Sequence, residues 1–312
     1  MQEDLNKKNQ LLEAITLAQS QYISENEPMV LFTNLLQNIL NVTDSKYGFI
    51  GEVFYQSNGR PFLKTHAISN IAWNKETIEF YKKNAPSGME FRNLKTLFGG
   101  ALTSKKLVIS NEPGNDPRAG GLPQGHPPLN AFLGIPLLDG NRLVGMLGIA
   151  NRPDGYDEKI VEFLKPLLLT ITNIIKAVAA EKKRQQAEEK LMENNSILKV
   201  IAETTQFCLV YLDANFNFKW VNMAYAETCQ LDPEYFPGKN IFALFPDVEN
   251  QAIFQRVVDS GESHTVHAKS FKCPNMSEST YWDWTLHPVK STFGRVDGLI
   301  LALLDVTERK KS

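Results

Sequence analysis

Residues 131–150 read "AFLGIPLLDGNRLVGMLGIA", two apolar runs on either side of Asp139, Gly140 and Asn141. An Asp-Gly pair between apolar runs is a strong β-hairpin signal, because glycine readily adopts the positive φ that a tight turn requires. A second signal of this kind, Asn58-Gly59, separates "YGFIGEVFYQ" from "FLKTHAIS". The two hairpins predict an antiparallel sheet in the first half of the chain.

Helical patterns surround these strands. An apolar stripe at spacings of four, three and four predicts a lead-in helix over residues 5–22, formed by Leu11, Ile15, Ala18 and Tyr22. "MVLFTNLLQNIL" at 29–40 and "NKETIEFYKKN" at 74–84 predict two further helices. Strands with helices before and after them indicate the α+β class.

A longer stripe alternates steps of four and three, the heptad spacing of a helix that packs along its length. Its members are Ile160, Leu164, Leu167, Ile171, Ile174 and Val178. Pro166 lies inside this stripe and predicts a kink or a break near the start of the helix. The polar run over 180–195 has high helical propensity and predicts a helical connector over 181–195. Both a dimeric coiled coil and an exposed, solvated helix fit this connector.

The second half of the chain predicts another antiparallel sheet. "CLVYLDANFNFKWVN" forms a hairpin in which Phe216, Phe218 and Trp220 alternate with polar residues, so one face is buried. Short helices follow, and then three strands, "HTVHAKSF", "TYWDWTLHPVK" and, after a turn at Gly294, "GLILALLDVT". The result is a five-stranded sheet with helices inserted after its second strand.

Length and composition restrict the number of domains, the kinds of partner and the cellular location of the protein. The 312 residues correspond to about two domains. Because 33 basic residues are balanced against 35 acidic ones, we expect neither nucleic-acid nor membrane-surface binding. The charged N-terminus does not resemble a signal peptide, and residues 167–180 are too short and too polar to span a bilayer, so we expect a cytoplasmic protein. Three cysteines without a C-x-x-C spacing argue against a disulfide framework.

Two family resemblances cover nearly all of the chain. Residues 196–310 resemble a PAS domain, through "FKWVNMAY", "GKNIFALFP", "RVVDSGE" and the ending "GRVDGLILALLDVTERK". Residues 25–180 resemble a GAF domain, through "YGFIGEV", "LVISNEP" and "FLGIPLLDGNRLVGMLGIANRP". Together they resemble the sensory region of a multidomain sensor histidine kinase. The implied division is a lead-in helix over 1–24, a GAF-like domain over 25–180, the connector over 181–195 and a PAS-like domain over 196–312.

The resemblance implies a sensory input module of a two-component phosphorelay rather than an enzyme. Such a module binds a small ligand or cofactor in a GAF or PAS pocket, forms a homodimer through its helices and acts on a downstream kinase or response regulator. The chain contains neither a phospho-acceptor histidine box nor a glycine-rich ATP lid, so we expect catalysis outside these residues. The alternative is a ligand-free dimerisation or docking scaffold. A cyclic-nucleotide sensor is a third hypothesis that rests on analogy with GAF domains.

The loop "NDPRAGGLPQGHPP" over 115–128 could be a phosphate cradle, a metal loop or a lid. Gly120 and Gly125 have the spacing of a phosphate loop, but His126-Pro127 stands where Lys-Ser/Thr is required. A lid remains, to which Arg118 and His126 would add polar contacts. The simpler alternative is a surface loop in which Asp116 and Arg118 pair with each other.

The cofactor is unknown from the sequence. A covalent bilin in the first domain is disfavoured, because Cys208, Cys229 and Cys273 all fall in the second domain. Haem would need an axial ligand, for which His66 and His126 are the candidates in the first domain. Zinc in the second domain is disfavoured, because strand positions His264 and His267 face opposite ways unless the strand bulges.

Large apolar and polar side chains are the candidates for pocket walls, and the competing interpretation is that they are ordinary core residues. In the first domain the ligand-binding candidates are Trp73, Phe91, Phe98, Asp116, Arg118 and His126. In the second domain they are Trp220, Asn222, Phe254, Trp282 and Trp284. We predict neither catalytic nor metal-ligating residues.

Overall fold

The computed structural model describes residues 2–24, 28–69, 87–121, 128–271 and 280–311. By its internal contacts the chain divides into two units, Met1–Gln186 and Ala187–Ser312, and each is described by itself. The helix predicted over residues 74–84 lies outside the described residues.

The first unit is built on a six-stranded antiparallel sheet with the strand order β3-β2-β1-β6-β5-β4. Its strands are β1 (Tyr47–Tyr55), β2 (Pro61–Ile68), β3 (Glu90–Phe91), β4 (Val108–Ser110), β5 (Phe132–Asp139) and β6 (Arg142–Ala150). Its helices are α1 (Gln2–Ser24), α2 (Pro28–Thr43), α4 (Leu97–Ser104), the 3-10 turn η2 (Pro113–Asn115) and the first part of α5 (Glu158–Thr204). Both predicted hairpins are confirmed, with Asp139 opposite Arg142 and Tyr55 opposite Pro61.

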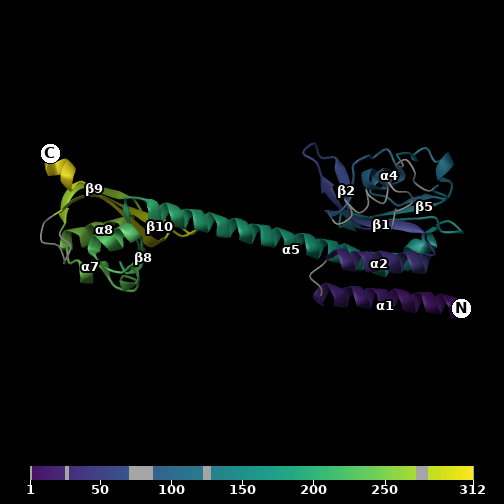
Figure 1. Cartoon of the computed structure of the whole chain (residues 1–312), viewed down its shortest axis with the longest axis horizontal. Helices are drawn as coiled ribbons and strands as arrows, with labels where there is room; N and C mark the ends of the chain where they lie inside the picture. The colour runs from purple at the N-terminus through teal and green to yellow at the C-terminus, as the bar shows by residue number, and fades with distance from the viewer. Residues whose placement is uncertain (1, 25–27, 70–86, 122–127, 272–279, 312) are drawn as a thin grey trace. The chain divides into compact units, whose positions relative to one another are not determined.

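Helices cover both faces of this sheet, and α2 and α4 lie on opposite sides of it in Figure 1. One core joins α1, α2 and α5 to strand residues such as Ile50 and Leu147, and a second core joins α4 to residues such as Met146. The predicted stripe of α1 is buried at Leu11 and Ala18, whereas Tyr22 is exposed. The sheet is thus a central layer between two apolar cores.

Helix α5 starts at Glu158 and continues without a break through Pro166 to Thr204. The predicted break is therefore wrong, and Leu164 and Leu167 on either side of the proline are both buried. By length and composition α5 could cross a membrane, with a mean hydropathy of 1.5 over 18 residues. A single helix of this kind is weak evidence, because core helices of soluble proteins also pass this criterion, and 39% of that window is buried.

The second unit is a five-stranded antiparallel sheet, as predicted, and the structure gives its strand order as β8-β7-β11-β10-β9. Its strands are β7 (Cys208–Asp213), β8 (Phe218–Val221), β9 (His264–Phe271), β10 (Thr280–Lys290) and β11 (Val296–Asp305). Its helices are α6 (Met223–Cys229), the 3-10 turn η3 (Pro233–Tyr235), α7 (Ile241–Leu244), α8 (Val248–Ser260) and α9 (Thr307–Lys311). The predicted α+β class is confirmed, with two antiparallel sheets and α5 as the helix that joins the units.

The alternation predicted for β8 is only partly correct. Phe216 and Phe218 are buried, but Trp220 is 36% exposed and Val221 is buried in its place. The register between β7 and β8 shifts after Tyr211, because Leu212 lies opposite Phe218 whereas Tyr211 lies opposite Trp220. The extra residue, Lys219, moves Val221 onto the face of Phe218 and turns Trp220 to the other face.

A candidate ligand cavity in the second unit

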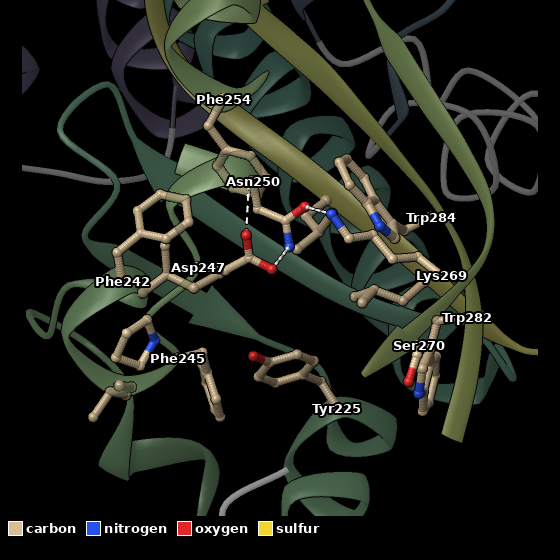
Figure 2. A pocket seen from close by; sticks show the side chains of 15 residues that line it. Tyr225, Phe242, Phe245, Asp247, Asn250, Phe254, Lys269, Ser270, Trp282 and Trp284 are labelled. Carbon is tan, nitrogen blue, oxygen red and sulfur yellow. Dashed lines mark hydrogen bonds between the residues drawn. The ribbon is translucent and has the colours of Figure 1, made fainter. Parts of the chain in front are cut away.

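A partly open cavity of about 290 Å³ lies between the inner face of the second sheet and helices α6, α7 and α8. Figure 2 shows its aromatic side chains around a hydrogen-bonded polar group of Asp247, Asn250 and Lys269, which we call the polar corner. Its lining residues are Tyr225, Ile241, Phe242, Leu244, Phe245, Pro246, Asp247, Asn250, Phe254, Lys269, Ser270, Trp282, Trp284, Leu301 and Leu303. The volume is at the small end of the range of ligand pockets, about 300–1,000 Å³.

The apolar wall consists of aromatic rings supplied by separate elements. Trp282 and Trp284 come from β10, where alternate residues share one face, and both are almost fully buried. The ring of Phe254 on α8 lies 6.0 Å from that of Trp284 and 5.1 Å from that of Phe242 on α7. Flat surfaces of this kind suit a planar guest, because offset and edge-to-face ring contacts are favourable.

The polar corner is organised by the start of α8. Asp247 is the N-cap residue, and its Oδ1 accepts the backbone N–H of Asn250 at 2.9 Å. The Asn250 Nδ2 donates to the other carboxylate oxygen at 3.0 Å, which fixes the side chain of Asn250. The ammonium of Lys269 on β9 donates to Asn250 Oδ1 at 2.8 Å and to Glu249 at 2.9 Å. The corner thus presents one cation, one carboxylate and one oriented carboxamide beside an aromatic wall.

Three of the five residues predicted for this pocket line the cavity, namely Phe254, Trp282 and Trp284. Trp220 and Asn222 do not line it. Asn222 is fully buried and caps α6 by accepting the backbone N–H of Tyr225, and it also accepts that of Leu209. Its Nδ2 donates to the carbonyl oxygens of Ala202 and Phe207, both at 2.8 Å. Asn222 therefore holds together the end of α5, the start of β7 and the start of α6.

The sequence pattern does not predict the polar corner. A cap signal was available, because Asp247 precedes the helical run "VENQAIFQRVV". Lys269 carries no signal of its own, since a single lysine in a strand is usually solvent-facing.

In the first unit, Phe91 and Phe98 lie together on the face of the sheet that α4 covers. Their ring centroids are 5.5 Å apart, and both rings contact Phe49. Both side chains pack against the core of the first unit that α4 covers, as ordinary core residues do. Trp73 and His126 lie outside the described residues.

Asp116 and Arg118 form the local pair that was the simpler alternative for their loop. Both nitrogens Nε and Nη2 of Arg118 donate to the Asp116 carboxylate, at 2.9 and 2.7 Å. The Arg118 hydrogen bond holds the pKa of Asp116 well below its usual range. The two charges neutralise each other at the surface, where the Arg118 side chain is 45% exposed.

His66 lies on the face of the first sheet that α2 covers, and not with Phe91 and Phe98. Its ring stacks on Phe32 at a centroid distance of 4.4 Å, and its Nε2 lies 3.3 Å from Glu52 Oε2. In the second unit, His267 Nδ1 lies 3.6 Å from Asp283. Among the described residues, which do not include Cys273, no group of three His, Cys, Asp or Glu side chains could hold a metal ion.

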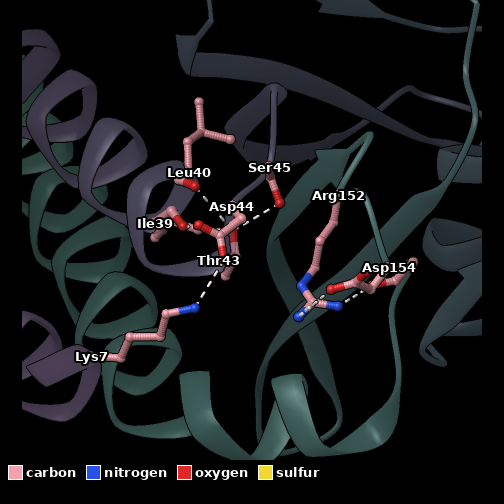
Figure 3. Close-up of polar contacts among 9 residues, drawn as sticks. Lys7, Ile39, Leu40, Thr43, Asp44, Ser45, Arg152 and Asp154 are labelled. Carbon is pink, nitrogen blue, oxygen red and sulfur yellow. Dashed lines mark hydrogen bonds and ion pairs between the residues drawn. The ribbon is translucent and has the colours of Figure 1, made fainter. Parts of the chain in front are cut away.

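Polar contacts at the end of α2 tie the first unit together (Figure 3). Lys7 on α1 pairs with Asp44 at 2.9 Å, and the Thr43 hydroxyl lies 2.8 Å from that of Ser45. Ser45 is in turn 2.8 Å from the hydroxyl of Tyr156, just before α5. Burial raises the pKa of Tyr156 to about 12. These contacts fasten α1, α2 and the segment before α5 to one another.

Several known proteins are similar to parts of this chain. A curated protein, the methyl sulfide methyltransferase-associated sensor of Methanosarcina acetivorans, is 30% identical over 157 residues, which are 50% of this chain and 14% of the relative. A GAF domain structure from a phosphoenolpyruvate-protein phosphotransferase of Coxiella burnetii is 12% identical and covers 56% of this chain and 98% of that one, with a TM-score of 0.44. The PAS domain structure of nitrogen regulation protein NR(II) from Vibrio parahaemolyticus is 15% identical and covers 34% and 95%, with a TM-score of 0.30.

Two family models match the chain in succession. One is described as "GAF domain" and matches residues 26–176, and the other is described as "PAS fold" and matches residues 202–311. The first match corresponds to the six-stranded unit, and the second to the five-stranded unit with the cavity. The chain therefore consists of a GAF domain followed by a PAS domain, two domains of the sensory, signalling class.

Proposed function

We propose that this chain is the sensory input module of a signal-transduction histidine kinase, and that its PAS cavity binds a small planar ligand. The observation that carries the proposal is the cavity itself, an aromatic chamber with Lys269 and Asn250 at one corner. A relative that is named a sensor supports the signalling role. In this proposal the protein is cytoplasmic, and catalysis belongs to a downstream kinase or response regulator rather than to these residues.

The polar corner indicates what kind of ligand the cavity would take. An ammonium has three N–H donors, and contacts to Glu249 and Asn250 account for two of those of Lys269 within the described structure. A ligand with an acceptor or anionic group could take the third, while its flat body lies against Trp282 and Trp284. Because Glu249 is 78% exposed at its side chain, water already screens that ion pair, and a ligand anion could replace it.

A matched pair of probes tests this assignment on the full chain. Indole-3-carboxylate and indole share a ring system, but only the first carries an anion. We expect the carboxylate to bind saturably in isothermal titration calorimetry, because the cavity offers Trp282 and Trp284 to its ring and Lys269 to its anion. Lys269→Met should weaken its binding by about tenfold, the effect of one lost charge-assisted hydrogen bond of about 1.4 kcal/mol. Lys239→Met is the control, because Lys239 is an exposed lysine of the same domain outside the cavity lining.

Two outcomes would count against the ligand proposal. Equal binding of both probes to the wild type and to Lys269→Met would show that the lysine does not select the ligand. Native mass spectrometry of the purified protein provides a second measurement, in which a retained small molecule supports a ligand sensor. If no small molecule is retained and neither probe binds, the ligand-sensor proposal is wrong and the ligand-free scaffold is the better description of this chain.

We also propose that α5 forms a parallel dimer with a second copy of the chain. Leu191, Leu198 and Ile201 are exposed at heptad spacing, with Asn194 at the intervening position. A heptad assigned from these residues puts Lys183 at position g and Glu188 at position e. In a parallel pair, g of one helix faces the following e of its partner, so lysine meets glutamate. An antiparallel pair would place like charges together.

Cysteine cross-linking tests the orientation of this dimer. Leu191→Cys should form a disulfide between two copies under mild oxidation, because equivalent core positions face each other in a parallel coiled coil. Met192→Cys is the matched control, since it places the thiol one residue away on the outer surface. Equal cross-linking of both variants, or of neither, would contradict the proposed dimer.

A further inference from the structure

Strand β9 contains a bulge next to the lysine of the cavity. In its pairing with β10, Trp282 lies opposite Lys269 and Trp284 lies opposite Val266, so two residues of β9 oppose Asp283 alone. One of them, Ala268, has a φ of 47°, which is unfavourable for an alanine. In a regular strand, residues three apart face opposite sides. Because of the bulge, Val266 and Lys269 instead face the same side, where Val266 packs in the domain core and Lys269 lines the cavity.

The carboxylate of Asp283 stabilises this unusual backbone. Its Oδ1 accepts the backbone N–H of Ala268 at 2.7 Å, a short charge-assisted hydrogen bond. The hydrogen bond from Ala268 also keeps the pKa of Asp283 below its ordinary value, so the group is a carboxylate at neutral pH. Asp283 lies outside the cavity lining, but it fixes the residue that immediately precedes Lys269.

The second oxygen of the same carboxylate contacts the last helix. Arg309 on α9 donates through Nη2 to Asp283 Oδ2 at 3.1 Å. Neighbouring contacts hold α9 against the same strand, because the backbone N–H of Tyr281 donates to Thr307 Oγ1 at 2.9 Å. The ammonium of Lys310 also lies over the Tyr281 ring at 4.9 Å. One side chain therefore bridges the bulge that aims Lys269 and the helix that ends the described chain.

We propose that Asp283 is a positioning residue that couples Lys269 in the PAS cavity to the docking of α9. A ligand that draws the Lys269 ammonium toward itself moves the adjacent bulge, and Asp283 passes this change to Arg309. The ligand step rests on the proposed function, whereas the link between the bulge and α9 is a property of the ligand-free protein. An experiment can therefore contradict the ligand step without contradicting the link between the bulge and α9, and the reverse.

The ligand-free link is tested by nuclear magnetic resonance on the full chain, with selectively ¹⁵N-labelled alanine and lysine. In the wild type we expect slow exchange of the Ala268 amide, because it is bonded to a carboxylate. Asp283→Ala should speed this exchange by about tenfold or more, the loss of a hydrogen bond to a charged group. Asp283→Asn retains an acceptor for Ala268 but lacks the charge that pairs with Arg309, and it serves if the alanine variant does not fold.

Arg309→Met separates a coupled network from two independent contacts. Coupling predicts that this change on α9 shifts the Ala268 resonance, and that Lys269→Met shifts the Lys310 resonance. Both effects should be lost in the Asp283→Ala background. Asp297→Asn is the control, because Asp297 pairs with Arg295 in the same domain. An unmoved Ala268 resonance in Arg309→Met, or a Lys269→Met effect that persists without Asp283, would overturn the proposal.

Indole-3-carboxylate extends the test to the ligand. If the probe binds and shifts Lys310 in the wild type but not in Asp283→Ala, the full pathway is supported. If it binds both proteins and shifts Lys310 equally in each, the coupling is wrong while the ligand proposal stands. If it does not bind, the ligand-free comparison still decides the coupling.

Discussion

Replacing Asn222 by alanine should strongly destabilise the PAS domain, although Asn222 lies outside the cavity lining. The side chain is fully buried and makes four hydrogen bonds to the backbone. Two are accepted from the N–H groups of Leu209 and Tyr225, and two are donated to the carbonyl oxygens of Ala202 and Phe207. Alanine offers none of them and leaves four polar groups without that partner.

The magnitude follows from these contacts. Loss of an N-cap costs about 1 kcal/mol, and each backbone group left buried and unpaired costs about 1–3 kcal/mol. Because water can reach some of these groups once the side chain is removed, we expect a total of about 3–5 kcal/mol rather than the full sum. For a domain of this size the melting temperature should fall by roughly 10–20 °C.

Urea unfolding of the full chain, followed by tryptophan fluorescence, measures this effect. Three of the four tryptophans, Trp220, Trp282 and Trp284, belong to the PAS domain and report its transition. Asn240→Ala is the matched control, because Asn240 caps α7 in the same way but is only half-buried. We expect the control to lose about 1–2 kcal/mol. A loss of the same size in both variants would refute the reasoning that burial makes Asn222 a structural joint.

Three further predictions concern the other parts of the chain. Asp116→Asn should destabilise the GAF domain by about 1–3 kcal/mol in urea unfolding, because asparagine loses the charge on a side chain that is only 9% exposed and accepts two hydrogen bonds from Arg118; no measurable loss would contradict this reasoning. The folded-state pKa of Tyr156, about 12, exceeds the ordinary value, so its contribution to stability is complete below about pH 10 and is lost as the pH rises through about 12. Tyr156→Phe should remove this alkaline loss, as urea midpoints at about pH 8 and about pH 11 would show, and an unchanged pH dependence would contradict the assignment. Lys183→Glu should weaken the proposed α5 dimer in sedimentation analysis, and Glu188→Lys in the same chain should restore it; an unaffected dimer would exclude this pairing.

Much of the fold could be predicted from local sequence alone. The turn at Asp139-Gly140 and the alternation of Trp282 and Trp284 predict strands and their buried faces correctly. These features depend on backbone geometry within a few residues. Side chains alternate between the two faces of any strand, and glycine permits a tight turn wherever it lies, so neither depends on the rest of the chain.

The candidate site could be predicted only in part. Phe254, Trp282 and Trp284 were found because large apolar residues on a patterned face are buried wherever they lie. Trp220 was misplaced, because the extra residue in β8 depends on its pairing with β7, which the local pattern does not contain. Lys269 was missed for the same reason, since the bulge at Ala268 decides which way it faces.

The sequence by itself determined the two domain folds, the two hairpins of the first domain and most of the buried stripe of α5. Only the tertiary structure decided that Lys269, Asn250 and the two tryptophans share one cavity, and that Asp283 lies between this cavity and α9. The physical reason is distance along the chain. Periodicity reports what neighbouring residues do, whereas a cavity and its polar corner form where strands and helices far apart in sequence are packed together.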